Sequence, residues 1–108
     1  MTVLRAALAL ATLIAGAAIA QNYPAKTVRV IVPYPPGGGN DIIARAVVDE
    51  LTRRTSQQFF VDNRPGASTI IGAELAAKSA PDGYTLFVSS QTTLAIVPNL
   101  KSKVPYDP

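Results

Sequence analysis

The chain has 108 residues, with ten lysine and arginine side chains against seven aspartate and glutamate side chains, and it contains no cysteine, histidine or tryptophan. A chain of this length forms at most one domain. The missing cysteine and histidine exclude a disulfide framework and a Cys/His zinc site, so an enzyme of this sequence would depend on carboxylates, Ser/Thr, Lys or Tyr. Only Arg53 and Arg54 are adjacent basic residues, and this pattern predicts no nucleic-acid partner.

The N-terminal segment has the pattern of a secretory signal peptide. Arg5 supplies a positive charge, residues 6–19 are uncharged and apolar, and residues 18–20 have the small-x-small form of a cleavage site. The apolar stretch is too short for a membrane anchor, because as a helix it spans about 21 Å against a hydrocarbon core of about 30 Å. We therefore predict a signal peptide over residues 1–20, cleavage before Gln21 and a periplasmic location.

The rest of the chain alternates between predicted strands and helices. Apolar patterning predicts strands over residues 27–32, 58–62 and 84–88, and helices over residues 41–55 and 69–79. A shorter helix over residues 94–100 is expected to be interrupted by Pro98, and residues 104–108 are expected to be extended. Helices of this length between strands imply βαβ crossovers. The predicted fold class is α/β, a β-α-β-α-β segment of a parallel sheet.

The first long helix carries an apolar stripe that we expect to face the sheet. Its members recur at helical spacing and are Ile43, Ala46, Val47, Val48 and Leu51. Asn40 is predicted to cap the start of this helix. In the second helix, Ile71 and Leu75 share one face, and the adjacent alanines at 76 and 77 allow close packing.

Ligands of parallel sheets bind outside the carboxyl ends of the strands, which directs attention to residues 33–40, 63–68 and 89–93. In the first of these segments, three consecutive glycines let the backbone approach a ligand without Cβ obstruction. The helix start that follows offers free N–H groups and a partial positive charge, which suit a carboxylate or a phosphate. A flexible turn between strand and helix explains the same glycines without any ligand.

Neither nucleotide-binding motif is present in this glycine segment. Gly39 is followed by Asn-Asp-Ile where a P-loop needs Gly-Lys-Ser/Thr. The dinucleotide fingerprint needs a glycine at position 42, which is Ile42. Asp62, at the end of the second predicted strand, does match the ribose-binding acid of that fingerprint. A secreted nucleotide-binding α/β fragment therefore remains as an alternative.

Several polar side chains near these segments have both a structural and a binding interpretation. Asp41 either caps the helix or acts on a ligand, and capping is favoured. Arg64 either pairs with a ligand carboxylate or is a solvated structural cation, and Tyr34 either lines the cleft or packs locally. The hydroxyl groups after the third strand either bind an anion or cap the following helix; they belong to Ser89, Ser90, Thr92 and Thr93.

Four motifs in order resemble one family of transport receptors. They are KTVRVIVPYPPGGGND at residues 26–41, DNRPGA at 62–67, APDGYTL at 80–86 and PYDP at 105–108. This combination resembles the Bug-type receptors, the extracytoplasmic solute-binding proteins of tripartite tricarboxylate transporters. The match runs from Tyr23 to the last residue, and four ordered motifs are far more specific than one glycine loop.

The resemblance implies a monomeric, non-enzymatic periplasmic receptor that captures a small carboxylated solute and needs no cofactor or metal. Two lobes of such a receptor close on the solute and deliver it to the membrane components of the transporter. Backbone groups, hydroxyls and ordered waters of the loops after the strands hold the carboxylate. Carried over by position, the candidate ligand-binding residues are Pro36, Gly37, Gly38, Gly39, Asn40, Asp41, Asn63, Arg64, Ala67, Ser89, Ser90, Gln91 and Thr92.

The sequence departs from the family pattern at several points. After Ala67 the family usually has two glycines and an asparagine, whereas this chain has Ser68, Thr69 and Ile70, and Val97 stands where an asparagine is common. The family chain also continues well beyond the motif that ends at Pro108. The expectation is that residues 21–108 form a partial N-terminal lobe, of the type II periplasmic-binding kind, with at most weak solute binding. A remnant that binds nothing is the second alternative.

Overall fold

The computed structural model describes residues 22–108, and the predicted signal peptide lies outside the described residues. The strands and the longer helices are β1 (Val28–Val32), α2 (Gly39–Thr55), β2 (Phe59–Asn63), α3 (Ile70–Ala77) and β3 (Thr85–Phe87). Two short helical segments, η2 (Ala67–Thr69) and η3 (Thr92–Ile96), precede α3 and α4 (Val97–Leu100) respectively. Within residues 22–108, no helix is long and apolar enough to cross a membrane.

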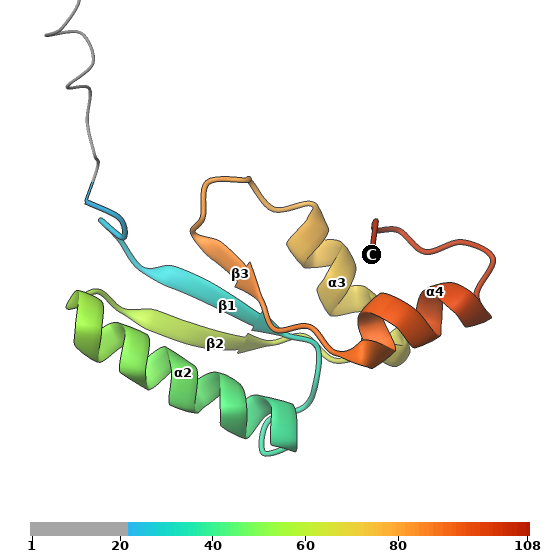
Figure 1. Ribbon diagram of the computed structural model, residues 1–108, viewed down its shortest axis with the longest axis horizontal. Coiled ribbons are helices and arrows are strands. Elements are labelled where there is room, and N and C mark those ends of the chain that lie inside the picture. Colours follow the sequence, from blue (N-terminus) through green and yellow to red (C-terminus); the bar gives the residue numbers. More distant parts are fainter. Residues whose placement is uncertain (1–21) are drawn as a thin grey trace, which may run out of the picture.

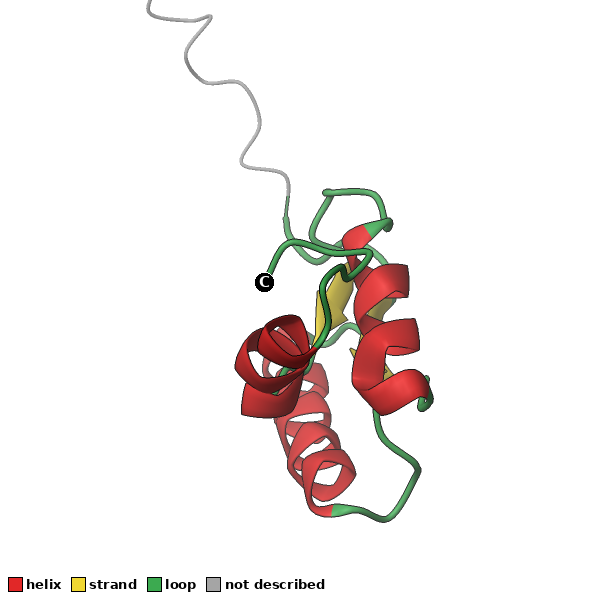
Figure 2. Cartoon of the chain, turned by 90° about the vertical axis from the view of Figure 1, so that its right-hand side faces the viewer, coloured by secondary structure: helices red, strands yellow, loops and turns green. Residues whose placement is uncertain are grey.

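The three strands form one parallel sheet in the order β2-β1-β3 (Figure 1). The chain leaves β1 for one side of the sheet and then crosses back to the other side to form β3. Because crossovers between parallel strands are right-handed, this reversal places the two long helices on opposite faces of the sheet, as Figure 2 shows. The predicted α/β class with a parallel sheet is confirmed.

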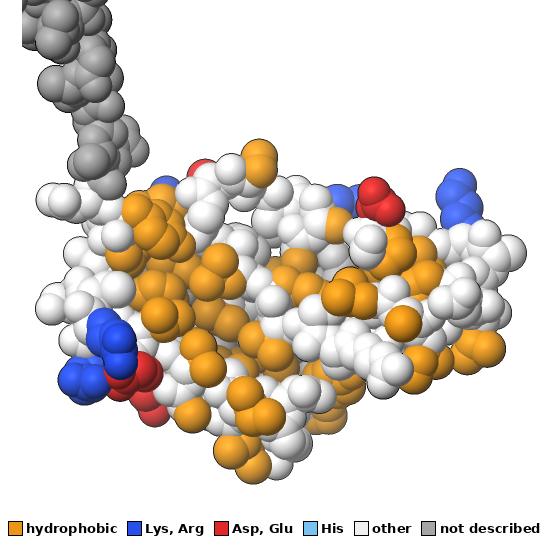
Figure 3. All heavy atoms as spheres, in the orientation of Figure 1, with side chains coloured by type: hydrophobic (Ala, Val, Ile, Leu, Met, Phe, Trp, Pro, Cys, Tyr) orange, Lys and Arg blue, Asp and Glu red, His pale blue; other side chains and the backbone are white. Residues whose placement is uncertain are grey.

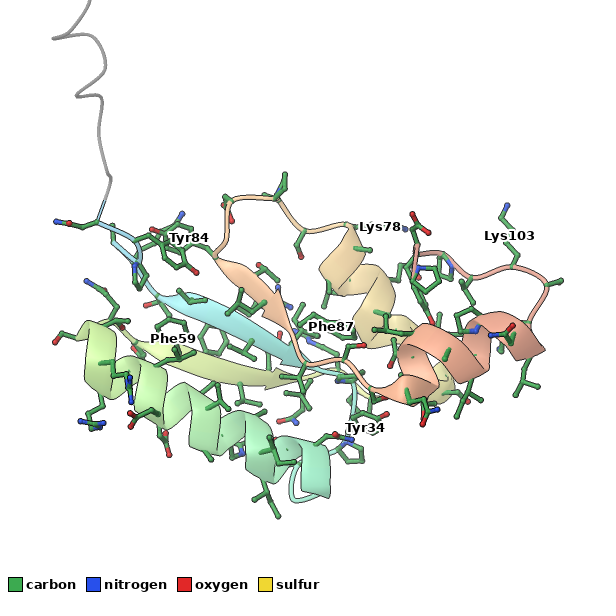
Figure 4. The ribbon with its side chains drawn as sticks, viewed as in Figure 1. Tyr34, Phe59, Lys78, Tyr84, Phe87 and Lys103 are labelled. Atoms are coloured by element: carbon green, nitrogen blue, oxygen red, sulfur yellow. The ribbon has the colours of Figure 1, made fainter. Side chains whose placement is uncertain are left out.

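The main core lies between the sheet and α2. Val28 and Val30 of β1 point to this face, where they pack with Val48 of α2 and Phe59 of β2. Figure 4 shows the ring of Phe59 between the strands and the helix. Ile31, which alternates with these residues along β1, faces the opposite side and is fully buried. β1 is therefore buried on both faces, as its nearly continuous apolar sequence predicts.

The predicted apolar stripe of α2 is wrong in part. Val48 is buried, but the side chains of Ile43 and Val47 are 62% and 51% exposed. The residues that α2 turns fully to the sheet are Asp41, Ala44 and Val48. The reason is the position of the helix, which packs over β1 and β2 and makes no comparable contact with β3. Part of the stripe therefore extends past the covered strands.

The start of α2 also differs from the prediction. The helix begins at Gly39, its N-cap is Gly38, and Asn40 lies in its first turn without capping it. Extended backbone at Gly38, whose carbonyl accepts a hydrogen bond from the Ile42 N–H at 3.0 Å, starts the helix earlier than a side-chain cap at Asn40 would. Further along the chain, Pro98 does not interrupt a helix but lies in the first turn of α4, where its missing N–H costs nothing.

Helix α3 packs through its smallest residues. Its buried residues are Gly72 and Ala73, whereas Ile71 is half exposed. A Cβ atom at Gly72 would lie 2.8 Å from Cβ of Pro33 and 2.9 Å from the carbonyl oxygen of Arg64. Gly72 therefore lets α3 approach the end of β1 more closely than alanine would. The sequence predicts this close packing at the alanines at 76 and 77 instead.

An apolar groove of about 240 Å³ runs between α2 and the edge strand β3. The exposed side chains of Ile43 and Val47 form its helical wall, and Leu86 and Val88 form part of its other wall. Figure 3 shows apolar side chains gathered on this face. The groove is the continuation of the α2 stripe beyond the covered part of the sheet.

Two adjacent valines of α2 give a matched test of this packing. We expect Val48→Ala to lower the free energy of unfolding by about 2 kcal/mol, because it leaves a cavity in the core. Val47→Ala removes the same atoms from an exposed position and is expected to change it by less than about 0.5 kcal/mol. Urea unfolding of both variants measures the difference. Equal losses of unfolding free energy would contradict the exposed position of Val47.

Candidate functional site

The candidate site lies at the carboxyl ends of the strands, where the strand order reverses. In open parallel sheets this reversal point forms the ligand-binding crevice. Here it falls between β1 and β3, so the crevice is bounded by the segments that follow these strands. We call residues 33–38 loop 1, residues 64–69 loop 2 and residues 88–91 loop 3. Figure 4 shows Tyr34 at this end of the sheet and Tyr84 at the other.

Side-chain hydrogen bonds hold the three loops together. The hydroxyls of Tyr34 in loop 1 and Ser90 in loop 3 are 2.6 Å apart. Thr93, just after loop 3, donates from Oγ1 to Oγ1 of Thr69 in loop 2 at 2.9 Å. The structure therefore brings together the three segments that the sequence predicts to meet. Tyr34 joins two of these loops, which refines the prediction that it lines the cleft or packs locally.

The glycine segment presents backbone rather than side chains. Gly37 has φ +89°, a left-handed conformation that glycine adopts without strain, and Gly37, Gly38 and Gly39 are exposed. Gly39 and Asn40 are the first two residues of α2, so their N–H groups have no acceptor within the helix. These groups lie at the positive end of the α2 dipole. Pro36, also exposed, precedes them.

Asp41 is buried, with 2% of its surface exposed, and its carboxylate is fully occupied within the protein. Oδ2 accepts hydrogen bonds from the N–H of Gly37 and from Nε of Arg45, both at 2.9 Å. Oδ1 accepts from Nδ2 of Asn63 at 2.8 Å, and the same amide donates to the carbonyl of Tyr34 at 3.0 Å. Asp41 and Asn63 therefore shape loop 1 and tie it to the end of β2.

The charge of Asp41 is stabilised by these partners. Hydrogen bonds from Arg45, Gly37 and Asn63 outweigh the effect of desolvation and hold the pKa of the Asp41 carboxyl far below its ordinary value. Arg45 in turn has its pKa raised by Asp41. The ion pair neutralises the carboxylate, so the start of α2 keeps free N–H donors without a net negative charge beside them.

Arg64 and Asp62 are paired with each other at the end of β2. Nε of the exposed Arg64 donates to Oδ1 of Asp62 at 2.9 Å, and Nε of Arg29 donates to Oδ2 at 2.6 Å. Burial raises the pKa of Asp62. The hydrogen bonds and charges of Arg64 and Arg29 together lower this pKa by more, so it lies below the ordinary value. A carboxylate engaged by two arginines is not free to bind a ribose, and Arg64 pairs with Asp62 while its contact with a ligand stays a prediction.

The hydroxyl groups in and just after loop 3 differ in burial and in hydrogen bonding. Oγ of Ser89 is buried and makes no hydrogen bond to any described residue. Ser90 is engaged with Tyr34, and its Oγ also lies 3.4 Å from the N–H of Thr93. Gln91 is exposed and precedes η3, and Thr92 is half-buried at its start. Ser90 thus links loops 1 and 3 and accepts a hydrogen bond from the first turn of the following helical segment, while its binding of an anion stays a prediction.

Two residues that the sequence analysis did not place in the site, Thr69 and Gly72, also shape it, together with Thr93. Thr69 and Thr93 are buried at 4% and 0% exposure and form the contact between loops 2 and 3, while Gly72 brings α3 against loop 1. A glycine inside a helical pattern is a signal that could have identified Gly72. Ala67, which was predicted, is exposed and has φ +48°. Within residues 22–108, no three His, Cys, Asp or Glu side chains gather as metal ligands.

The chain is thus an α/β segment whose parallel sheet has a glycine-lined reversal point, the place where such sheets bind ligands. Residues 43–108 match the model of the tripartite tricarboxylate transporter family receptor, and the chain belongs to this family. The family consists of solute-binding receptors, which are not enzymes, so the predicted family and non-enzymatic class are confirmed.

Individual relatives agree with this assignment. The chain is 44% identical to Protein BugT of Bordetella pertussis over 94 residues, which cover 86% of this chain and 29% of BugT. It is 46% identical to a periplasmic transporter of solved structure, with a TM-score of 0.77 over 80% of this chain and 29% of that one. A protein of R. palustris solved with adipate gives 34% identity and a TM-score of 0.77, again over 80% and 29%. The chain thus spans less than a third of the length of these relatives.

Replacing Asp41 with asparagine is expected to flatten the acid limb of the stability profile. The lowered pKa of Asp41 stabilises the folded state above its unfolded pKa of about 4, and this stabilisation is lost as the pH falls below that value. Asp41→Asn should therefore be less stable at pH 7 and lose less on acidification. Denaturant unfolding between pH 7 and pH 2 measures both effects.

Asp49→Asn is the matched control, since Asp49 is exposed on the same helix. It should keep the acid dependence of the original protein. An Asp41→Asn profile with the original slope would show that the hydrogen bonds to this carboxylate are not what stabilises the folded state.

Proposed function

We propose that this chain is part of a periplasmic receptor that binds a small carboxylated solute at the reversal point of the sheet. The observation that carries the proposal is the exposed glycine segment at the start of α2, where the N–H groups of Gly39 and Asn40 have no acceptor within the helix. Backbone donors at a helix start suit a carboxylate. The ion pair of Asp41 and Arg45 beside them removes the repulsion that a free carboxylate would exert on an anion.

Relatives of known ligand are consistent with this chemistry. The structures of similar proteins include one with adipate and one, MatC of Rhodopseudomonas palustris, with bound malate, to which this chain is 37% identical over 60% of its length. Both ligands are dicarboxylates. We therefore place dicarboxylates first among the solutes to be tested, with Ser89, Ser90, Gln91 and Thr92 as further candidate donors.

We further propose that residues 21–108 form part of the N-terminal lobe of a two-lobed receptor. The apolar groove beside β3 supports this, because a face lined by exposed Ile43 and Val47 is one that further chain covers in a complete lobe. The share of the relatives' length that the chain spans supports it as well. In a complete receptor, the second lobe closes on the solute and the membrane components of the transporter then receive it.

Residues 21–108 by themselves are expected to bind solute weakly, because in the proposed two-lobed receptor the second lobe supplies part of the contacts. We expect a Kd of about 1 mM or weaker for malate and adipate, which corresponds to about −4 kcal/mol. Titration of the purified protein, followed by amide chemical shifts, measures it. Tight and saturable binding would show that the binding site is complete within these residues.

Gly38→Val tests the assigned position of the solute. An added Cβ at Gly38 would meet only the carbonyl oxygen of Pro35, at 3.7 Å, and its backbone is in an ordinary region, so the fold is expected to tolerate the change. The side chain should nevertheless block approach to the N–H donors and abolish the chemical-shift response to malate and adipate. Ala80→Val, at the exposed turn before β3 and far from the loops, is the matched control and should keep that response. Unchanged affinity in Gly38→Val would remove the glycine segment from the binding site.

We propose in addition that residues 1–20 direct export and are removed. Relatives of this chain are periplasmic binding proteins, which supports a periplasmic location. The intact mass of the protein recovered from a periplasmic extract tests the cleavage site. A mass equal to that of residues 21–108 would support cleavage before Gln21, and a retained N-terminus would contradict it.

A further inference from the structure

Loop 2 ends in a left-handed segment of unusual length. Gly66, Ala67, Ser68 and Thr69 have φ values of +128°, +48°, +54° and +77° in succession. Glycine adopts such values freely, but for the other three residues the Cβ crowds the backbone, and for a β-branched threonine the conformation is rare. Strained positions of this kind persist only where surrounding contacts hold them, and they concentrate at functional sites.

The hydroxyl of Thr69 provides such a contact. Thr69 is the N-cap residue of α3, where a threonine ordinarily hydrogen-bonds the backbone of its own helix, but it makes no side-chain cap hydrogen bond. Its Oγ1 instead accepts a hydrogen bond from Oγ1 of Thr93, and both side chains are buried. The hydroxyl therefore connects loop 2 to the residues after loop 3 and is not used for helix capping.

The contact extends from Thr93 to the other loops. Oγ of Ser90 lies 3.4 Å from both the N–H and Oγ1 of Thr93, and it pairs with the hydroxyl of Tyr34 in loop 1. The hydroxyl of Tyr106 donates to the carbonyl of Thr93 at 2.6 Å. The placement of Thr93 thus decides where Ser90, a candidate solute donor, is held.

Ser68 and Thr69 occupy left-handed backbone positions that suit glycine. Glycine would adopt these left-handed conformations without strain, but it could not supply a hydroxyl. At Thr69 a strained backbone occurs together with a buried hydrogen bond between two loops of the binding edge. The strained position therefore coincides with the contact that links the loops.

We propose that Thr69 is a positioning residue for solute binding, whose hydroxyl fixes Thr93 and Ser90 in the arrangement that the solute meets. The proposal rests on the proposed carboxylate-binding function of this edge. Thr69 itself is buried, so its hydroxyl acts on the solute only through Thr93 and Ser90. Its effect on affinity is separate from its effect on stability, because the left-handed backbone is strained while the hydroxyl is favourable.

Substitutions at Thr69 separate these two effects. Thr69→Val keeps the strain and removes the hydroxyl, Thr69→Gly removes both, and Thr69→Ser keeps the hydroxyl. We expect Thr69→Gly to be more stable than Thr69→Val in urea, yet both to bind malate or adipate about fivefold to tenfold more weakly than the original protein, the change that one net hydrogen bond carries. Thr69→Ser should retain the affinity. Thr93→Val should weaken binding to a similar degree, and combining it with Thr69→Val should add little.

Val48→Ala, in the core under α2, is the matched control for lost stability and should leave affinity unchanged. Affinity that follows stability across the set, with Thr69→Gly binding like the original protein, would overturn the positioning role. If the original protein binds no carboxylate, the proposed function fails first. Amide hydrogen exchange of Ser90 and Thr93 then decides the inference, since faster exchange in Thr69→Gly and unchanged exchange in Thr69→Ser support it, and equal exchange in both contradicts it.

Discussion

The buried carboxylate of Asp41 accepts hydrogen bonds from three segments of the chain, and the binding edge takes its shape from them. Gly37 could adopt many conformations, but its N–H is held by Asp41, and Asn63 joins the same carboxylate to the carbonyl of Tyr34. Because Arg45 neutralises the charge, the α2 dipole still presents a positive end to solvent. One acidic side chain thus orders a glycine loop and leaves its remaining donors free.

Much of this architecture follows from local sequence patterns. The strand at residues 27–32 is apolar on both faces, and the structure buries it on both faces as the central strand. The alternation of strands with long helices determines a parallel sheet, and the preference for right-handed crossovers then determines which face each helix covers. The three loops that meet at the carboxyl edge follow from this topology without any knowledge of side-chain contacts.

The remaining features depend on contacts between residues far apart in the sequence. Asp41 looks like a helix-start acid until Asn63, twenty-two residues later, is placed beside it. The stripe of α2 indicates a buried face, but only the width of the sheet decides that Ile43 and Val47 stay exposed. Likewise Thr69 resembles an ordinary N-cap, and its partner Thr93 is known only once η3 has been positioned. Helical periodicity identifies the residues that share a face, but it does not determine how much of that face is buried against other elements.

A binding edge made of backbone donors has a consequence for specificity. In the proposed function, the N–H groups at the start of α2 bind a carboxylate in the same way whatever is attached to it, so they do not distinguish one dicarboxylate from another. Discrimination then depends on side chains, and in this lobe the hydroxyls of loop 3 are the candidates for it. Their placement depends on Thr93 and, through it, on the strained backbone at Thr69. On the proposed function and the proposed role of Thr69, a change at this buried threonine alters which solute the edge accepts, while the backbone donors hold the carboxylate common to all of them.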